Sequence, residues 1–67
     1  MSSDNYYLVW HRDGAFYVTM EFASNDDPAD FDPDFARQFD TLEDAMTWAE
    51  SEYSEYGVFM DESASSL

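Results

Sequence analysis

The sequence predicts a small α+β domain: an antiparallel sheet, made of a β-hairpin and a short third strand, covered on one face by one main helix. Three observations predict it. Two β-favouring apolar runs flank an Asp-Gly pair within residues 6–22, a helical pattern begins at Thr41, and a short apolar run covers residues 58–60. The element order is ββαβ, or ββααβ if a second helix precedes the main one. The 67 residues are expected to form one domain, with flexible tails at 1–5 and 61–67.

The hairpin reads YYLVWHRDGAFYVTMEF, and an Asp-Gly pair between alternating apolar runs is typical of a tight turn. A two-residue turn pairs Arg12 with Ala15. A three-residue loop, with Gly14 as a left-handed bulge residue, pairs His11 with Ala15. Because a slip of one residue turns a strand over, the sharper division of apolar and polar residues favours the three-residue loop. That register gathers these residues on the core face: Tyr6, Leu8, Trp10, Phe16, Val18, Met20 and Phe22.

The connection between the hairpin and the helix is the most acidic stretch of the chain. Asp30, Asp32 and Asp34 alternate there as the first three ligands of a calcium-binding loop do. The sixth position of that loop is Phe35 instead of glycine, and the twelfth is Thr41 instead of glutamate. We therefore expect no metal site.

The same connection is expected to contain a short helix. Asp32 is a candidate N-cap, with Pro33 at the first helical position and Asp34 in the first turn. Phenylalanines recur every fourth residue and would anchor the segment by one face: Phe31, Phe35 and Phe39. Residues 37–39 also fit a short extra strand, and the sequence alone does not choose between helix and strand there.

The main helix has clearer signals. Thr41 is a good N-cap, and Glu43 and Asp44 lie in the first turn, where the helix macrodipole favours acids. Gly57 is expected to end the helix as its left-handed C-cap. Apolar residues at helical spacing make the predicted buried stripe: Leu42, Ala45, Met46, Ala49, Tyr53 and Tyr56. No basic residue follows the acids at i+3 or i+4, so no pair within the helix neutralises them.

Charge is the most informative property of the composition. Sixteen Asp and Glu residues oppose two arginines, with no lysine, and the net charge is −14. Such a charge suggests disorder, but 45% hydrophobic and 19% aromatic residues indicate a chain that folds. A folded domain of this charge repels itself. The charge therefore points to life in high salt or to a positively charged partner.

Several classes of function are disfavoured by what the sequence contains. There is no cysteine and a single histidine, so neither a zinc site nor a nucleophile–base pair can be assembled, and we expect no enzyme and no cofactor. Direct nucleic-acid binding needs many cations, and with two arginines and no lysine this chain is not expected to bind nucleic acid. No apolar run approaches the roughly 18 residues of a membrane span, and the N-terminus lacks the features of a signal peptide. A cytoplasmic location is expected.

The candidate binding site is the set of carboxylates on the acidic connection and the helix. Its members are Asp26, Asp27, Asp30, Asp32, Asp34, Glu43, Asp44, Glu50 and Glu55. Duplex DNA is an array of regular negative charge that proteins contact with Lys and Arg. An array of unpaired carboxylates offers a similar target, so the expected partner is a basic protein surface. The apolar residues Tyr7, Val9 and Tyr17, placed on the outer face of the sheet, allow a monomer or a weak homodimer.

With these features the chain resembles the small acidic anti-CRISPR proteins of phages and mobile elements that act as DNA mimics against type I surveillance complexes, type I-C among them. The likeness lies in the size, the hairpin, the acidic loop NDDPADFDPDF and the helix FDTLEDAMTWAESEYSEYG. The resemblance implies an inhibitor, without catalysis, that binds the DNA-recognition surface of a Cascade subunit in the host bacterial cytoplasm.

Two other functions stay open at this point. A salt-loving organism would use the excess of Asp and Glu, and the absence of lysine, for solubility alone. An acidic adaptor for another basic partner, such as a polymerase or a toxin, would have the same composition as an anti-CRISPR inhibitor.

Overall fold

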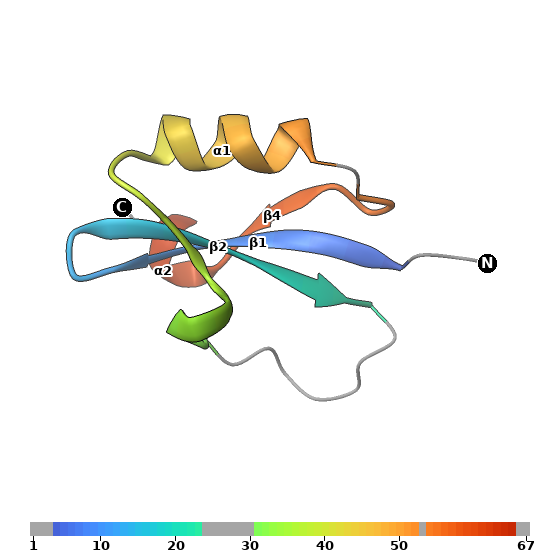
Figure 1. Ribbon diagram of the computed structural model, residues 1–67, viewed down its shortest axis with the longest axis horizontal. Coiled ribbons are helices and arrows are strands. Elements are labelled where there is room, and N and C mark those ends of the chain that lie inside the picture. The colour runs from blue at the N-terminus through green and yellow to red at the C-terminus, as the bar shows by residue number, and fades with distance from the viewer. Residues whose placement is uncertain (1–3, 24–30, 53, 66–67) are drawn as a thin grey trace.

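The structure, a computed structural model, describes residues 4–23, 31–52 and 54–65. A four-stranded mixed sheet has the strand order β3-β2-β1-β4, and α1 lies across one face of it (Figure 1). The predicted α+β class with one main helix is confirmed. Along the chain the elements are β1 (Asn5–Arg12), β2 (Ala15–Phe22), the 3-10 helix η1 (Pro33–Phe35), β3 (Arg37–Phe39), α1 (Leu42–Ser51), β4 (Val58–Met60) and α2 (Glu62–Ser65).

The hairpin register differs from the predicted one. Arg12 pairs with Ala15, so the two-residue turn forms and the prediction of a three-residue loop is wrong. Both turn residues have positive φ, 52° at Asp13 and 80° at Gly14. A type I′ turn needs this conformation, and its twist matches the twist of the flanking strands. The local turn chemistry therefore outweighs the sharper apolar division that the other register offered.

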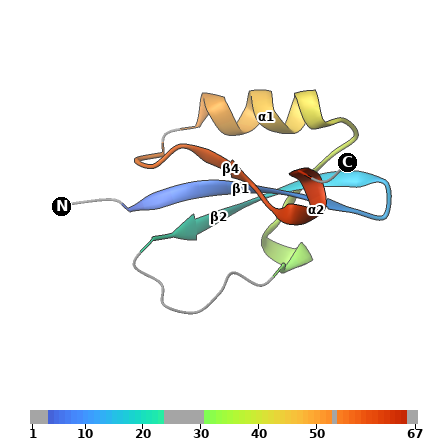
Figure 2. The ribbon, with the colours of Figure 1, turned by 180° about the vertical axis from the view of Figure 1, so that it is seen from behind.

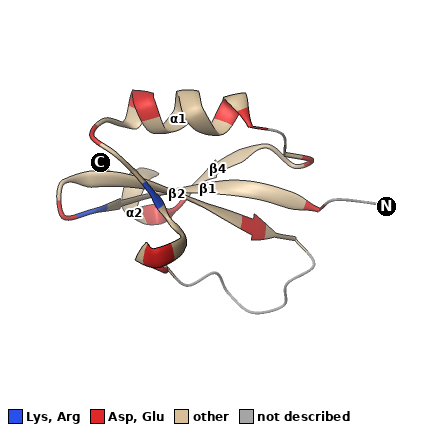
Figure 3. Ribbon diagram, in the orientation of Figure 1, with Lys and Arg blue, Asp and Glu red and all other residues tan. Residues whose placement is uncertain are grey.

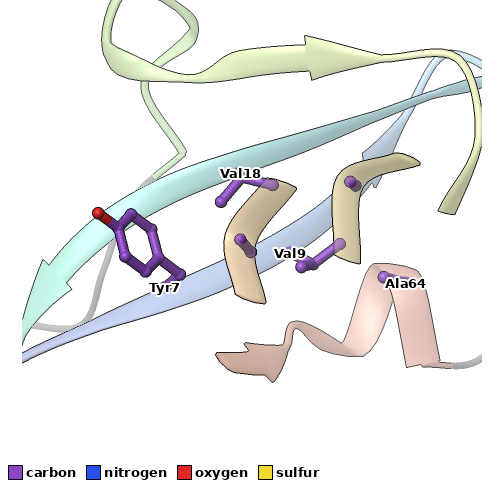
Figure 4. Close-up of a cluster of buried hydrophobic side chains, with 6 residues drawn as sticks. Tyr7, Val9, Val18 and Ala64 are labelled. Carbon is purple, nitrogen blue, oxygen red and sulfur yellow. The ribbon is translucent and has the colours of Figure 1, made fainter. Parts of the chain in front are cut away.

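The change of register changes which residues form the core. Tyr7, Val9 and Val18 lie beneath α1 and cluster with Ala45, Ala49 and Ala64, as the close-up in Figure 4 shows for the labelled members. Tyr7 and Val9 were expected on the outer face, and that expectation is wrong. Two residues expected in the core, Met20 and Phe22, are about half exposed (50% and 47%).

The sheet is mixed because β4 runs parallel to β1, with Tyr7 opposite Val58 and Val9 opposite Met60. An antiparallel third strand was expected beside β1. The difference arises at β3, the optional strand, which pairs antiparallel with β2 and therefore runs in the direction of β1. From β3 the chain crosses the sheet through α1, and such a crossover returns the next strand in the same direction.

The end of α1 and both ends of the described chain differ from expectation. The main helix ends at Ser51, with Glu52 as its C-cap, so Gly57 (φ 88°) precedes β4 instead of capping the helix. The segment from residue 61, expected to be a flexible tail, contains α2, which lies beside β1 and β4 (Figure 2). Its Ala64 is only 3% exposed. At the other end, Asn5 is a buried residue of β1 rather than part of a tail.

Candidate functional site

The described carboxylates of the predicted site lie on three segments. Asp32 and Asp34 belong to η1 and its N-cap, Glu43, Asp44 and Glu50 to α1, and Glu55 to the loop before β4. All six of these residues are exposed. Figure 3 shows acidic residues toward both ends of α1 and at η1. Asp26, Asp27 and Asp30 lie outside the described residues.

The start of α1 holds two of these acids in a defined geometry. Thr41 is the N-cap, as predicted, and its Oγ1 accepts a hydrogen bond from the Asp44 amide at 3.1 Å. Glu43 and Asp44 lie in the first turn, where the free N–H groups and the macrodipole stabilise negative charge. Glu50 lies in the last turn, where the macrodipole disfavours it. The helix therefore holds acids at both ends, although local electrostatics favour them at only one.

The N-terminus of the short helix η1 is capped as predicted, but Phe35 is 82% exposed, so the expectation that it anchors the segment is wrong. The Asp32 Oδ1 accepts a hydrogen bond from the Asp34 amide at 3.0 Å, and Pro33 occupies the first position. The strand predicted as an alternative forms as well, because the chain leaves η1 through Ala36 in an extended conformation and enters β3. Within the described part of the chain, no group of three or more His, Asp or Glu residues is placed to hold a metal ion.

Both arginines lie over aromatic rings. The Arg12 guanidinium is 4.5 Å from the centroid of Phe31, and that of Arg37 is 5.1 Å from the centroid of Trp48. Stacking of this kind is a common use of arginine. The two positive charges thus pack on aromatic side chains, and the carboxylates of Glu43, Glu50 and Glu55 make no ion pair with any described residue.

Asp61 is an acid whose role was missed because it lay in the presumed tail. Its Oδ2 accepts a hydrogen bond from the Ser63 amide at 2.9 Å, and its carbonyl oxygen accepts from the Ala64 amide at 2.9 Å. Burial by itself would raise the pKa of Asp61. The hydrogen bonds from the Ser63 side chain and the Ser63 and Glu62 amides, together with the Arg12 charge, outweigh burial and lower that pKa below its ordinary value. Asp61 is therefore a structural residue that fastens α2.

Two grooves, which sequence reasoning also missed, border β4. The first, of about 580 Å³, lies between the end of α1 and β4. Its lining combines apolar, polar and acidic residues: Met46, Glu50, Glu52, Ser54, Gly57 and Val58. The second, of about 370 Å³, is lined by Tyr6, Ala23, Tyr56 and Phe59. The only sequence signals for these grooves were apolar residues that the predicted helix and third strand were thought to bury.

The lone imidazole of His11 packs against a ring, 4.8 Å from the centroid of Phe16. The helices of the described residues are too short or too polar to cross a membrane.

No family model, curated protein or solved structure matches this chain.

Proposed function

We propose that this protein is a non-enzymatic inhibitor that binds a basic nucleic-acid-binding surface by mimicking the charge of DNA. The observation that carries the proposal is the array of exposed carboxylates on η1, α1 and the following loop, with both arginines stacked on aromatic rings instead of paired with this array. An acidic body of this kind is drawn by long-range attraction to a surface rich in Lys and Arg, and it then occupies that surface.

The spacing of charge along α1 supports the same proposal. Glu43 and Glu50 are seven residues apart, which corresponds to about 10 Å along a helix that rises 1.5 Å per residue. One strand of DNA presents a phosphate about every 3.4 Å along the axis, so the two carboxylates span about three phosphate steps. The two carboxylates therefore lie at an axial separation close to that of phosphates three steps apart on one strand of DNA.

Within this class we propose an anti-CRISPR protein that blocks target-DNA binding by a type I surveillance complex. The support for this choice is the resemblance in size, hairpin, acidic loop and helix. The partner would be a Cascade subunit, contacted through its DNA-recognition surface, in the bacterial cytoplasm.

A gel-shift assay tests the proposal. The purified protein is added to type I surveillance complexes, type I-C included, before labelled target DNA. We expect the DNA shift to disappear with at least one subtype, and the inhibition to weaken as salt rises past about 0.3 M, since exposed charges are then screened within several ångströms. Inhibition of another basic DNA-binding protein, with every surveillance complex unaffected, would indicate an adaptor or inhibitor for a different partner.

Charge variants show whether the proposed site is responsible. Asp34→Lys combined with Glu43→Lys should reduce inhibition at least tenfold, because both residues belong to the array. Glu21→Lys combined with Asp40→Lys changes the net charge equally outside the array and serves as the control, with an expected loss below threefold. Equal loss in the two double variants would show that only net charge matters, and unchanged inhibition in the first would exclude the proposed site.

A second candidate is a protein adapted to high salt, and its supporting observation is the spread of acids over separate elements. Acidic residues occupy the hairpin turn, η1, both ends of α1 and the start of α2. A halophilic domain should unfold in 0.1 M salt and fold in molar salt, since screening removes its self-repulsion. A cooperative thermal transition at 0.1 M salt would exclude this candidate.

A further inference from the structure

The outer edge of β4 is free of strand pairing within the described residues, because β4 is a terminal strand of the sheet. Its inner edge is fixed by hydrogen bonds from the Tyr7 amide to the Gly57 carbonyl (3.0 Å) and from the Asp61 amide to the Val9 carbonyl (2.7 Å). Backbone groups alternate in direction along a strand, so the amide and carbonyl of Phe59 face β1, and those of Val58 and Met60 face outward. Such an edge can accept a strand from another chain.

The groove on the α1 side of this edge suits a basic side chain. Met46 and Val58 supply apolar surface, and Glu50 and Glu52 supply negative charge. Lysine and arginine bury an aliphatic stem on apolar surface while the charged head meets a carboxylate. The carboxylates of Glu50 and Glu52 have no described cation beside them, so a basic side chain of a partner would be the first to neutralise them.

The groove on the other side of the edge suits an apolar side chain. Tyr6 and Phe59 meet edge to face, with ring centroids 5.6 Å apart, and Tyr56 and Ala23 complete the lining. Phe59 and Tyr56 are about half exposed, at 51% and 54%. Exposed aromatic side chains around an apolar groove are typical of an interaction site.

We propose that the β4 edge binds an extended, cationic segment of the partner protein as an added strand. Successive side chains of a strand point to opposite faces. The segment would therefore place Lys or Arg in the Glu50–Glu52 groove and apolar residues in the Tyr6–Phe59 groove, in alternation. This inference rests on the proposed function only for the cationic character of the partner, and it adds backbone pairing and an apolar groove to the charge contacts, with Glu50 shared by the two sites.

Charge decides between this occupant and a second copy of the chain. Two copies that paired through β4 would bring together two bodies with a net charge of −14 each, which disfavours association at low salt. The arginines give no relief, since Arg37 lies on β3 at the opposite edge of the sheet and Arg12 lies at the hairpin end of β1. A cationic segment is instead attracted by this negative charge.

The test uses a fluorescent seven-residue peptide in which Lys and Leu alternate, titrated into the protein at 0.1 M salt and followed by anisotropy. A peptide of the same composition, with its leucines and lysines in two blocks, is the control for charge. We expect the alternating peptide to bind at least tenfold more tightly. A version with N-methyl groups on alternate amides, chosen to block pairing with Val58 and Met60, should lose this advantage.

Protein variants locate the peptide. Met60→Pro removes an outward N–H while keeping the bonds to β1, as proline is tolerated at strand edges, and should weaken binding at least tenfold. Glu50→Gln with Glu52→Gln should weaken it about tenfold, whereas Asp13→Asn with Asp40→Asn, an equal change of charge outside the groove and the array, should weaken it less than threefold. Far-ultraviolet circular dichroism confirms folding. Should Met60→Pro not fold, the N-methylated peptide on the unaltered protein gives the decisive result.

Three results would overturn the inference: equal binding of the alternating and block peptides, equal binding by a folded Met60→Pro variant, or a dimer at 0.1 M salt that Met60→Pro abolishes. The gel-shift assay separates this inference from the proposed function. Inhibition that depends on Glu43 without peptide binding supports the proposed function and excludes the added strand. Peptide binding without inhibition of any nucleic-acid-binding protein supports the added strand and counts against the proposed function.

Discussion

The two faces of the sheet are covered in different ways. On one face, Val9 and Val18 pack beneath Ala45 and Ala49 of α1, and Val9 and both alanines are fully buried. On the other face, Trp10 and Thr19 are buried at a hydrogen bond of 2.9 Å between the indole N–H and the hydroxyl. Phe31 lies edge to face against Trp10 there, with ring centroids 5.5 Å apart.

Small side chains between α1 and the sheet explain how a small, highly charged domain holds an acidic helix in place. Alanine side chains let α1 lie close to the sheet, so the helix that presents Glu43 and Glu50 is held by close packing of small groups, which tolerates little change of volume. The other face depends on one hydrogen bond and on ring contacts. The placement of the acids on α1 should therefore depend most on the packing between α1 and the sheet.

Truncation of one residue on each face gives the largest expected effect. Val9→Ala should lower the free energy of unfolding by about 2 kcal/mol, since two buried methyl-sized groups contribute about 0.8 kcal/mol each and a cavity adds to the loss. Leu8→Ala removes three carbon-sized groups from the opposite face, but Leu8 is only partly buried there, so the loss should be smaller, about 1.5 kcal/mol. Urea unfolding measures both. A larger loss for Leu8→Ala would reverse the order of the two faces.

The sequence predicted the elements better than it predicted how they pair. Thr41, Asp32 and Pro33 act at helix starts as expected, because capping is decided by a few neighbouring residues. The hairpin register was wrong, since counting apolar residues per face gave no weight to the left-handed conformation that Asp13 accepts beside Gly14. The parallel direction of β4 depends on β3, a strand of three residues that the sequence left undecided.

The Trp10–Thr19 bond gives the second, smaller effect, on the face that α1 does not cover. Thr19→Val should cost about 1–2 kcal/mol, because it leaves the buried indole N–H without its acceptor. Trp10→Phe should cost more, because it leaves the Thr19 hydroxyl unpaired and also opens a cavity beside the smaller ring. The double variant should then cost less than the sum by about 1 kcal/mol, which a double-mutant cycle of urea unfolding measures. Additive losses would mean that the bond contributes nothing to this face.

The candidate site was predictable only as a list of acids. Their exposure and lack of basic neighbours follow from composition and helical spacing, and six of the nine fall on described, exposed positions. The role of Asp61 and the two grooves beside β4 did not follow, because each depends on α2 or on the early end of α1. Those tertiary features bring together residues far apart in the chain, for which a sequence pattern has no periodicity to detect.

Asp61 and Glu50 give the smallest effect and compare an acid held by hydrogen bonds at the start of α2 with an acid in the last turn of α1. Asp61→Asn should lower the melting temperature at pH 7 by a few degrees. The lowered pKa means that Asp61 stabilises the fold above the ordinary aspartate value of 3.8 and loses this contribution as the pH falls through its lower folded-state value. Glu50→Gln should instead raise the melting temperature at pH 7, because it removes a charge from the last turn of α1 and from the overall repulsion.

The pH dependence separates these two causes. As the pH falls through the lowered folded-state pKa of Asp61, the stability that its charge contributes is lost, so the melting temperatures of Asp61→Asn and the unaltered protein should converge from below. Each comparison is made at one pH, which removes the general effect of acid on a chain of this charge. A decrease for both variants at pH 7 would show that repulsion between carboxylates costs this fold little. In that case the acidic residues would cost the fold little stability, and neither a high-salt environment nor a basic partner would be needed to explain why they are present.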